Sequence, residues 1–156
     1  GGLGMGFTLA AALKNTPGDI RITVSELIPA VVDWNRQFFG PLSGSPMDDA
    51  RVTVKIEDVM MTIQQQQNRW DGIILDVDNG PAGLTHRAND RLYAPKGLRS
   101  IHNALKTGGW LAVWSAADDP QFTRRLKKNG FSVALLRVRA RKSGKGSRHT
   151  IWLAQK

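Results

Sequence analysis

The 156-residue sequence contains no cysteine, which excludes a disulfide framework, a thiolate metal site and a cysteine nucleophile. No apolar run approaches the roughly 18 residues that a membrane span needs. The first residues are rich in glycine and uncharged, unlike a signal peptide. No group of histidine, aspartate and glutamate has metal-site spacing, so we expect no metal. These absences favour a cytoplasmic protein with no membrane partner.

Negative charge is missing from one part of the chain, because no acidic residue follows Asp119. The formal net charge is +9 and the isoelectric point is near 10.5. Because the residues after Asp119 include no acidic side chain, the excess of positive charge belongs to the C-terminal third. Such a surface favours acidic partners, nucleic acid among them. Arg139–His149 lacks interleaved aromatic residues for base stacking, so a solvated basic hairpin is the main interpretation and nucleic-acid binding the alternative.

Apolar runs alternate with helical patterns along the chain, which predicts an α/β domain with a mostly parallel sheet and right-handed crossovers. No helical pattern separates the last two strands, so we expect them to pair antiparallel. Gly72–Val77 is almost continuously apolar, as in a strand buried on both faces. Lys106-Thr-Gly-Gly109 resembles a glycine helix stop. Strands are predicted at Ile20–Glu26, Arg51–Glu57, Gly72–Val77, Trp110–Ser115, Phe131–Val138 and Thr150–Ala154.

Three glycines at alternate positions, Gly2, Gly4 and Gly6, precede the helical run Phe7–Leu13. Glycine lets the backbone turn tightly and approach a ligand where a Cβ would clash. The G-x-G-x-G spacing fits an adenosylmethionine loop better than a dinucleotide loop, and a purely structural turn is the alternative. Since such a loop should follow a strand, we expect residues 1–156 to be one N-terminally truncated Rossmann-like domain whose first strand lies upstream.

Carboxylates end the first two predicted strands. Glu26 follows the glycine loop by about 20 residues, where its two oxygens can hold both hydroxyls of a ribose. Asp58 ends the next strand, where it can accept a hydrogen bond from the exocyclic amine of adenine. The alternative for Asp58 is a helix N-cap, and one carboxylate does not easily serve both roles.

Two further aspartates, Asp76 and Asp78, follow the most apolar strand. Ligands of open parallel sheets bind beyond the carboxyl ends of the strands. Carboxylates at that edge can attract a cationic amine and accept its proton, which makes both residues catalytic candidates. The alternative is turn chemistry in Asp78-Asn79-Gly80-Pro81, which explains Asp78 better than Asp76. Tyr93 is a candidate for closing over the substrate, with a rim aromatic as the alternative.

The order of these motifs resembles the spermidine synthase family and its spermidine synthase-like relatives. The resemblance covers nearly the whole chain. It rests on the glycine loop, Val24-Ser-Glu-Leu-Ile-Pro29, Arg51-Val with a following Glu-Asp58, Asp71-Gly-Ile-Ile-Leu-Asp76, Leu92-Tyr93 and Leu105-Lys-Thr-Gly-Gly109. The resemblance implies a class I methyltransferase fold, with a seven-stranded sheet whose last strand is antiparallel. It also implies ribose contact by Glu26, adenine contact by Asp58 and an amine-facing role for Asp76.

The function implied by this resemblance is aminopropyl transfer from decarboxylated S-adenosylmethionine to a small amine, in polyamine biosynthesis. A first alternative is an S-adenosylmethionine-dependent methyltransferase that acts on a small molecule or RNA. A second is a nucleoside-binding module without turnover. The resemblance further implies a small β-rich region upstream of the domain and a homodimer.

Overall fold

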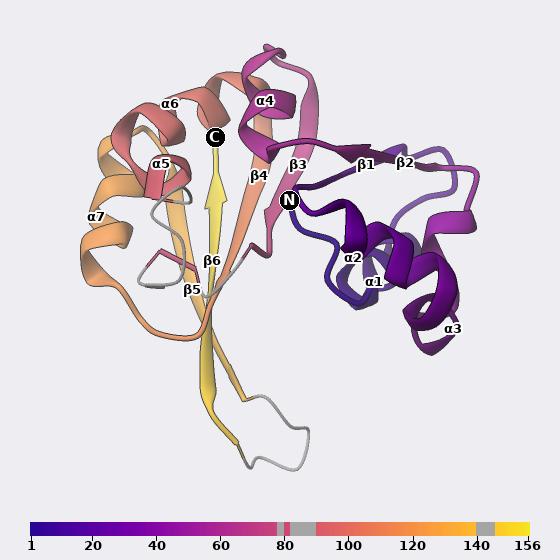
Figure 1. Cartoon of the computed structure of the whole chain (residues 1–156). Coiled ribbons are helices and arrows are strands. Elements are labelled where there is room, and N and C mark those ends of the chain that lie inside the picture. Colours follow the sequence, from indigo (N-terminus) through magenta and orange to yellow (C-terminus); the bar gives the residue numbers. More distant parts are fainter. Residues whose placement is uncertain (78–79, 82–89, 140–145) are drawn as a thin grey trace. The chain divides into compact units, whose positions relative to one another are not determined.

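The computed structural model describes residues 1–77, 80–81, 90–139 and 146–156, and it divides into two compact units. Unit 1 is Gly1–Thr62 and unit 2 is Ile63–Lys156. Strands and helices alternate along both, which confirms the α/β class (Figure 1). Across the described ranges, no helix combines the length and the apolarity needed to cross a membrane.

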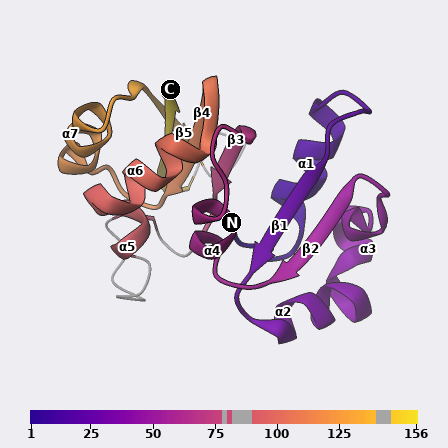
Figure 2. The ribbon, with the colours of Figure 1, turned by 90° about the horizontal axis from the view of Figure 1, so that it is seen from above.

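Unit 1 is built around two parallel strands, β1 (Ile22–Glu26) and β2 (Val52–Ile56), which lie side by side (Figure 2). Their valine, isoleucine and threonine residues suit a pleated, half-buried surface. Because Glu26 pairs with Ile56, both strands end at the same edge. The other elements of the unit are α1 (Phe7–Asn15), α2 (Pro29–Trp34), the π-helix Asn35–Phe39, α3 (Gly40–Ser43), the 3₁₀ turn Pro46–Asp48 and the start of α4 (Val59–Gln64).

The core of unit 1 joins the glycine loop to the strands and helices. Leu3, Leu9, Val24 and Val32 are all buried and form one apolar cluster. Leu3 belongs to the loop itself, so the loop is anchored by its own side chain as well as by its backbone. The packing fixes the loop against β1 and α2, which positions the candidate site.

Unit 2 contains a four-stranded sheet in the order β3-β4-β6-β5. The strands are β3 (Trp70–Leu75), β4 (Leu105–Ser115), β5 (Ser132–Arg139) and β6 (Arg148–Gln155). Strand β3 is parallel to β4, whereas β6 is antiparallel to both β4 and β5. The predicted antiparallel pairing of the last two strands is therefore confirmed, and β6 lies between β4 and β5.

Three helices, α5 (Asp90–Tyr93), α6 (Pro95–Ala104) and α7 (Pro120–Lys128), lie on one side of this sheet (Figure 1). Contacts between aromatic rings pack these helices against the sheet. The Tyr93 ring lies 5.5 Å from that of Phe122, which lies 5.1 Å from that of Trp152. Asp119 begins α7 as its N-cap, since its side chain accepts hydrogen bonds from the amides of Gln121 and Phe122.

Two local predictions are wrong. Strand β3 is not buried on both faces, because Ile74 is 44% exposed while Ile73 and Leu75 are buried. The helices described within unit 2, α5, α6 and α7, lie on one face of its sheet. The glycine helix stop is also wrong, because α6 ends at Ala104 and Leu105 is already extended. Gly108 instead lies within β4 with a φ of 78°, and its amide donates to the carbonyl of Lys156.

Candidate active site

The glycine loop of unit 1 has the left-handed backbone that favours glycine. Gly2, Gly4 and Gly6 have φ values of 82°, 52° and 82°. A Cβ on Gly6 would come within 2.9 Å of the Ser43 hydroxyl oxygen, whereas a Cβ on Gly4 would meet nothing within 4 Å. Gly6 is therefore required by packing, while the loop at Gly4 borders open space that a ligand could approach.

Glu26 lies at the carboxyl end of β1 and is only 7% exposed. Its Oε2 accepts a hydrogen bond from the Leu3 amide at 2.9 Å, and its Oε1 accepts one from the Ile28 amide at 2.9 Å. The amide of Gly2 donates to the carbonyl of Ser25, also at 2.9 Å. Two consecutive loop amides are thus tied to the end of β1. Glu26 is a clamp on the glycine loop, a role that the sequence did not suggest.

The clamp leaves acceptor capacity on Glu26. A carboxylate offers about four lone-pair positions, and the two backbone amides use one on each oxygen. Hydroxyl groups of a ligand can occupy the others. The ribose contact expected of Glu26 stays a prediction, and the observed geometry is compatible with it.

A second buried side chain, Asn35, also holds the glycine loop. It is 2% exposed, and its Nδ2 donates to the carbonyl of Gly4 at 2.7 Å and to that of Val31 at 2.9 Å. Asn35 begins the π-helix, a local irregularity that is frequent at functional sites. The sequence signal for it was an amide four residues after Val31, on the apolar face of the expected helix.

A chain of three polar side chains links the ends of β1 and β2. Thr62 Oγ1 donates to Glu57 Oε1, so the 2.7 Å contact between Ser25 Oγ and Thr62 Oγ1 must have Ser25 as its donor. The hydrogen bond from Thr62, helped by Lys55, lowers the pKa of Glu57 below its usual value. Ser25 and Thr62 are both buried. The arrangement keeps a carboxylate ionised at the carboxyl edge of this sheet.

Asp58 stands beside Glu57, at the start of α4. Its Oδ1 accepts a hydrogen bond from the Met60 amide at 2.9 Å, which is the geometry of a helix N-cap. The capping alternative is therefore present in the structure. The adenine contact expected of Asp58 stays a prediction.

In unit 2, Asp76 directly follows β3 and is exposed at the carboxyl edge of the sheet. Gly80 is buried with a φ of 81°, and a Cβ on it would come within 2.5 Å of Ser115 Cβ at the end of β4. Asp78, the other catalytic candidate, lies outside the described residues. The catalytic roles of both aspartates stay predictions.

Tyr93 does not lie at a rim. It is 3% exposed, and its ring packs edge-on against Phe122 in the core of unit 2. The rim alternative is therefore wrong, and the substrate contact expected of Tyr93 stays a prediction.

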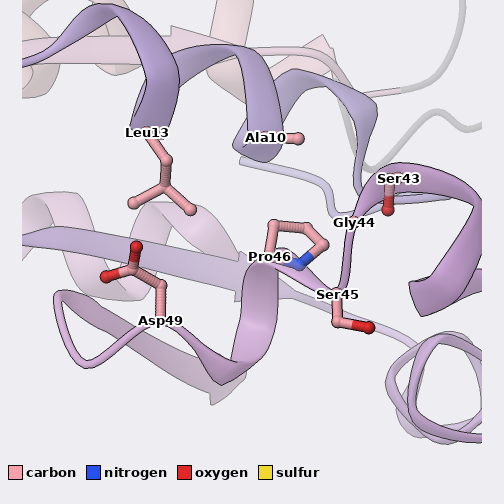
Figure 3. A pocket seen from close by; sticks show the side chains of 7 residues that line it. All are labelled: Ala10, Leu13, Ser43, Gly44, Ser45, Pro46 and Asp49. Atoms are coloured by element: carbon pink, nitrogen blue, oxygen red, sulfur yellow. The ribbon is translucent and has the colours of Figure 1, made fainter.

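A cavity of about 370 Å³ lies elsewhere in unit 1, between α1 and the turn that follows α3 (Figure 3). Asp49 lines it, but both oxygens of this carboxylate are engaged by Arg51, at 2.9 to 3.0 Å. None of the predicted site residues lines this cavity, so it is not the candidate site. Its lining residues are Ala10, Leu13, Ser43, Gly44, Ser45, Pro46 and Asp49.

Comparison with known structures shows a shared fold. The spermidine synthase from Thermotoga maritima superimposes with a TM-score of 0.76 and 20% sequence identity, over 99% of this chain and 52% of that one. A spermidine synthase in complex with the transition-state analogue AdoDATO gives a TM-score of 0.74 at 20% identity, over 99% of this chain and 51% of that one. Human methyltransferase-like protein 13 in complex with SAH gives a TM-score of 0.73 at 20% identity, over 99% of this chain and 68% of that one. These likenesses confirm the Rossmann-like methyltransferase fold.

Comparison of sequences is more specific. The polyamine aminopropyltransferase of Bacillus mycoides is 28% identical over 125 residues, which cover 80% of this chain and 42% of that protein. The polyamine aminopropyltransferase of Moorella thermoacetica is 30% identical over 112 residues, which cover 70% of this chain and 36% of that protein. The chain thus spans less than half the length of these relatives. The model of the spermine/spermidine synthase domain matches residues 8–130, most of the chain. This chain belongs to the spermine/spermidine synthase domain family.

Proposed function

We propose that the protein transfers an aminopropyl group from decarboxylated S-adenosylmethionine to a small amine, in polyamine biosynthesis. The observation that carries the proposal is the pair of hydrogen bonds between the glycine loop and the end of β1, from the Gly2 amide to the Ser25 carbonyl and from the Leu3 amide to Glu26, which places a buried carboxylate beside an open, left-handed loop. The names of the aminopropyltransferase relatives support the choice of transferred group.

The residues of unit 1 fit the nucleoside part of this substrate. Glu26 retains acceptor positions for ribose hydroxyls, and the backbone at Gly4 carries no side chain that would obstruct an approaching ligand. Leu27 and Ile28 follow Glu26 and are 62% and 52% exposed, so they offer apolar surface for a flat base. Binding a nucleoside there would bury this surface and stabilise the complex.

The chemistry is a displacement at carbon. The amine nitrogen attacks the methylene carbon attached to the sulfonium, the new N–C bond forms, and the C–S bond breaks with its electron pair returning to sulfur. The nucleoside leaves as a neutral thioether, and one proton must leave the nitrogen. Because the sulfonium is already activated, the protein needs mainly to orient the amine and to hold it unprotonated. Asp76 would attract the cationic amine and accept that proton.

The test is turnover by the purified protein with a panel of diamines and polyamines. With decarboxylated S-adenosylmethionine we expect release of methylthioadenosine and an amine product longer by one aminopropyl group. Product formed from S-adenosylmethionine alone, with release of S-adenosylhomocysteine, would instead establish the methyltransferase alternative. Nucleoside binding without product from either donor would establish the non-catalytic module.

The role of Asp76 has a matched control in the same strand region. We expect Asp76→Asn to lower turnover by about 100-fold, within the range of a lost acid–base group, with little change in nucleoside affinity. Asp71→Asn removes a carboxylate that pairs with Lys106 on the surface, and it should leave turnover unchanged. Full activity of Asp76→Asn would show that this aspartate only shapes the turn.

A further inference from the structure

The net positive charge of the protein belongs to unit 2. Unit 2 contains seventeen lysines and arginines against six aspartates and no glutamate, a formal charge of +11, whereas unit 1 has a formal charge of −2. Every charged residue after Asp119 is a lysine or an arginine. The last helix and the last two strands therefore carry a strong field of one sign.

Helix α7 presents part of this charge to solvent. Its apolar residues Phe122 and Leu126 are completely buried against the sheet. Arg124, Lys127 and Lys128 are exposed on the other side of the helix. Residues three and four apart on a helix are neighbours, so these three cations form one cluster.

The β5–β6 hairpin extends the cluster on the same side of the sheet. Leu135 pairs with Trp152, which packs against Phe122 of α7, so this face of the hairpin is the one that α7 covers. Strand alternation places Arg137 on that face, and Arg148 lies there too, two positions before the residue paired with Arg137. The pairing of β6 with β4 begins only at Thr150, so Arg148 lies where the hairpin projects beyond β4 (Figure 1).

Only part of this charge is neutralised. Asp118 pairs with Arg137 at 2.6 Å and Asp119 pairs with Arg125 at 3.3 Å. No described carboxylate lies within ion-pairing distance of the other cations, namely Arg124, Lys127, Lys128 and Arg148. A cluster of uncompensated cations costs stability through self-repulsion, which an anionic partner would relieve.

We propose that Arg124, Lys127, Lys128, Arg137 and Arg148, named here the α7–hairpin surface, bind the phosphodiester backbone of a nucleic acid. Helical rise separates Arg124 from Lys128 by about 6 Å along the axis, and strand rise separates Arg148 by about 6.8 Å from the residue paired with Arg137. Cations repeat at these intervals along the surface. Each interval is about twice the 3.4 Å of helix axis that separates successive phosphates of one nucleic-acid strand, so neighbouring cations can reach every second phosphate.

The surface favours nucleic acid over a membrane. A helix that binds a bilayer inserts an exposed apolar face, and α7 has its large apolar side chains buried against its own sheet. It also favours backbone contact over base recognition. The aromatic rings that pack between α7 and the sheet, Phe122 and Trp152, are completely buried and cannot stack on bases. Binding should therefore depend on salt and be nearly independent of sequence.

The test is fluorescence anisotropy of short labelled duplexes of RNA and of DNA, and of a labelled single strand, titrated with the purified protein. The variant is Arg124→Gln/Lys127→Gln/Lys128→Gln, since glutamine keeps helix propensity and removes charge. The matched control, Lys14→Gln/Arg21→Gln/Arg36→Gln, removes the same charge from unit 1. Circular dichroism verifies that both are folded.

We expect the α7 variant to bind at least one duplex about tenfold more weakly, and to lower the slope of log K against log salt by about 2–3. The control should bind like the wild type. Equal losses in both variants would overturn the proposal, because net charge alone would explain them. Binding to vesicles that contain phosphatidylserine but not to any nucleic acid would also overturn it, as would equally efficient displacement by poly-glutamate.

Discussion

At the residue scale, the carboxylate of Glu26 has an observed structural role, in holding the glycine loop, and a predicted role in binding the ribose. Removing it frees the amides of Leu3 and Ile28 as well as any ribose hydroxyls. A simple loss of affinity would therefore not distinguish a direct contact from a loosened loop. The distinction requires ligands with and without the hydroxyl groups.

We predict that Glu26→Ala weakens binding of methylthioadenosine by roughly 1.5–3 kcal/mol, the scale of a hydrogen bond to a charged group. Calorimetry measures this loss. For a 2′,3′-dideoxy analogue, the same substitution should cost clearly less, because no hydroxyl remains to be held. Asp33→Ala, which removes an exposed carboxylate paired with Arg36, is the control and should leave both affinities unchanged. Equal losses of binding free energy for the two ligands would show that Glu26 only holds the glycine loop and does not contact the ribose.

His102 provides a pH-dependent contribution to folding. Its ring packs edge-on against Phe131 at 5.1 Å, and burial, helped by Lys156, lowers its pKa below the usual 6.5. The unfolded chain therefore binds more protons than the folded chain in weakly acidic solution. Since the free energy of unfolding rises with pH where the unfolded state holds more protons, this contribution is complete above 6.5 and is lost as the pH falls towards the folded value.

We predict that unfolding temperature falls more steeply in the wild type than in His102→Gln between about pH 7 and 5. Thermal unfolding followed by circular dichroism over that range measures both slopes. The substitution itself should lower stability at neutral pH, because the ring contact with Phe131 is lost. Parallel pH profiles in the two proteins would show that His102 does not titrate differently in the folded state.

Residue patterns predicted the positions of the glycine loop, Glu26 and Asp76, because each is marked by its place after a strand or before a helix. They did not predict Asn35 or Thr62. The first donates to a carbonyl 31 residues away, and the second bridges hydroxyl and carboxylate groups from two strands. Contacts of that kind depend on how elements pack, which periodicity does not encode.

At the element scale, the six predicted strands are all present, with ends displaced by a few residues. The largest difference is β4, which begins at Leu105 rather than Trp110. The glycines at 108 and 109 suggested a helix stop, but the register pairs Trp70 with Leu105 across an irregularity, so tertiary pairing extended the strand. The helix-ending preference of glycine is a weak signal where a neighbouring strand offers hydrogen bonds to the same residues.

Gly80 is closely packed against Ser115 at the end of β4. We predict that Gly80→Ala destabilises the protein by about 2–4 kcal/mol, the sum of left-handed strain and overpacking against Ser115. Urea unfolding measures the free energy. The control is Gly108→Ala, where φ is 78° but a Cβ would meet nothing within 4 Å, so only the strain should appear. Equal losses of stability in the two variants would mean that the surroundings of Gly80 accommodate the added Cβ without an overpacking penalty.

At the scale of the whole molecule, local patterns left the sheet order open. They predicted an antiparallel final pair, but not that β6 lies between β4 and β5 or that the described strands form two sheets. Such order depends on long-range pairing. The charge partition, in contrast, could be read from the sequence, since the lysines and arginines after Asp119 have no acidic neighbours in the chain.

The edge of β1 offers a prediction about the sheet itself. Ile22 donates to the carbonyl of Arg51 on the β2 side, whereas the carbonyl of Ser25 accepts from Gly2 on the other side. By alternation, the amides of Thr23 and Ser25 point away from β2 and that of Val24 points towards it. Among the described strands, only β2 pairs with β1.

In the 156-residue chain we therefore predict that the Thr23 amide exchanges with deuterium much faster than that of Val24, measured by NMR. A parallel strand placed beside β1 in a longer form of the protein would bring the Thr23 amide to the protection of Val24. Equal protection of both amides in the 156-residue chain would show that the edge is already covered.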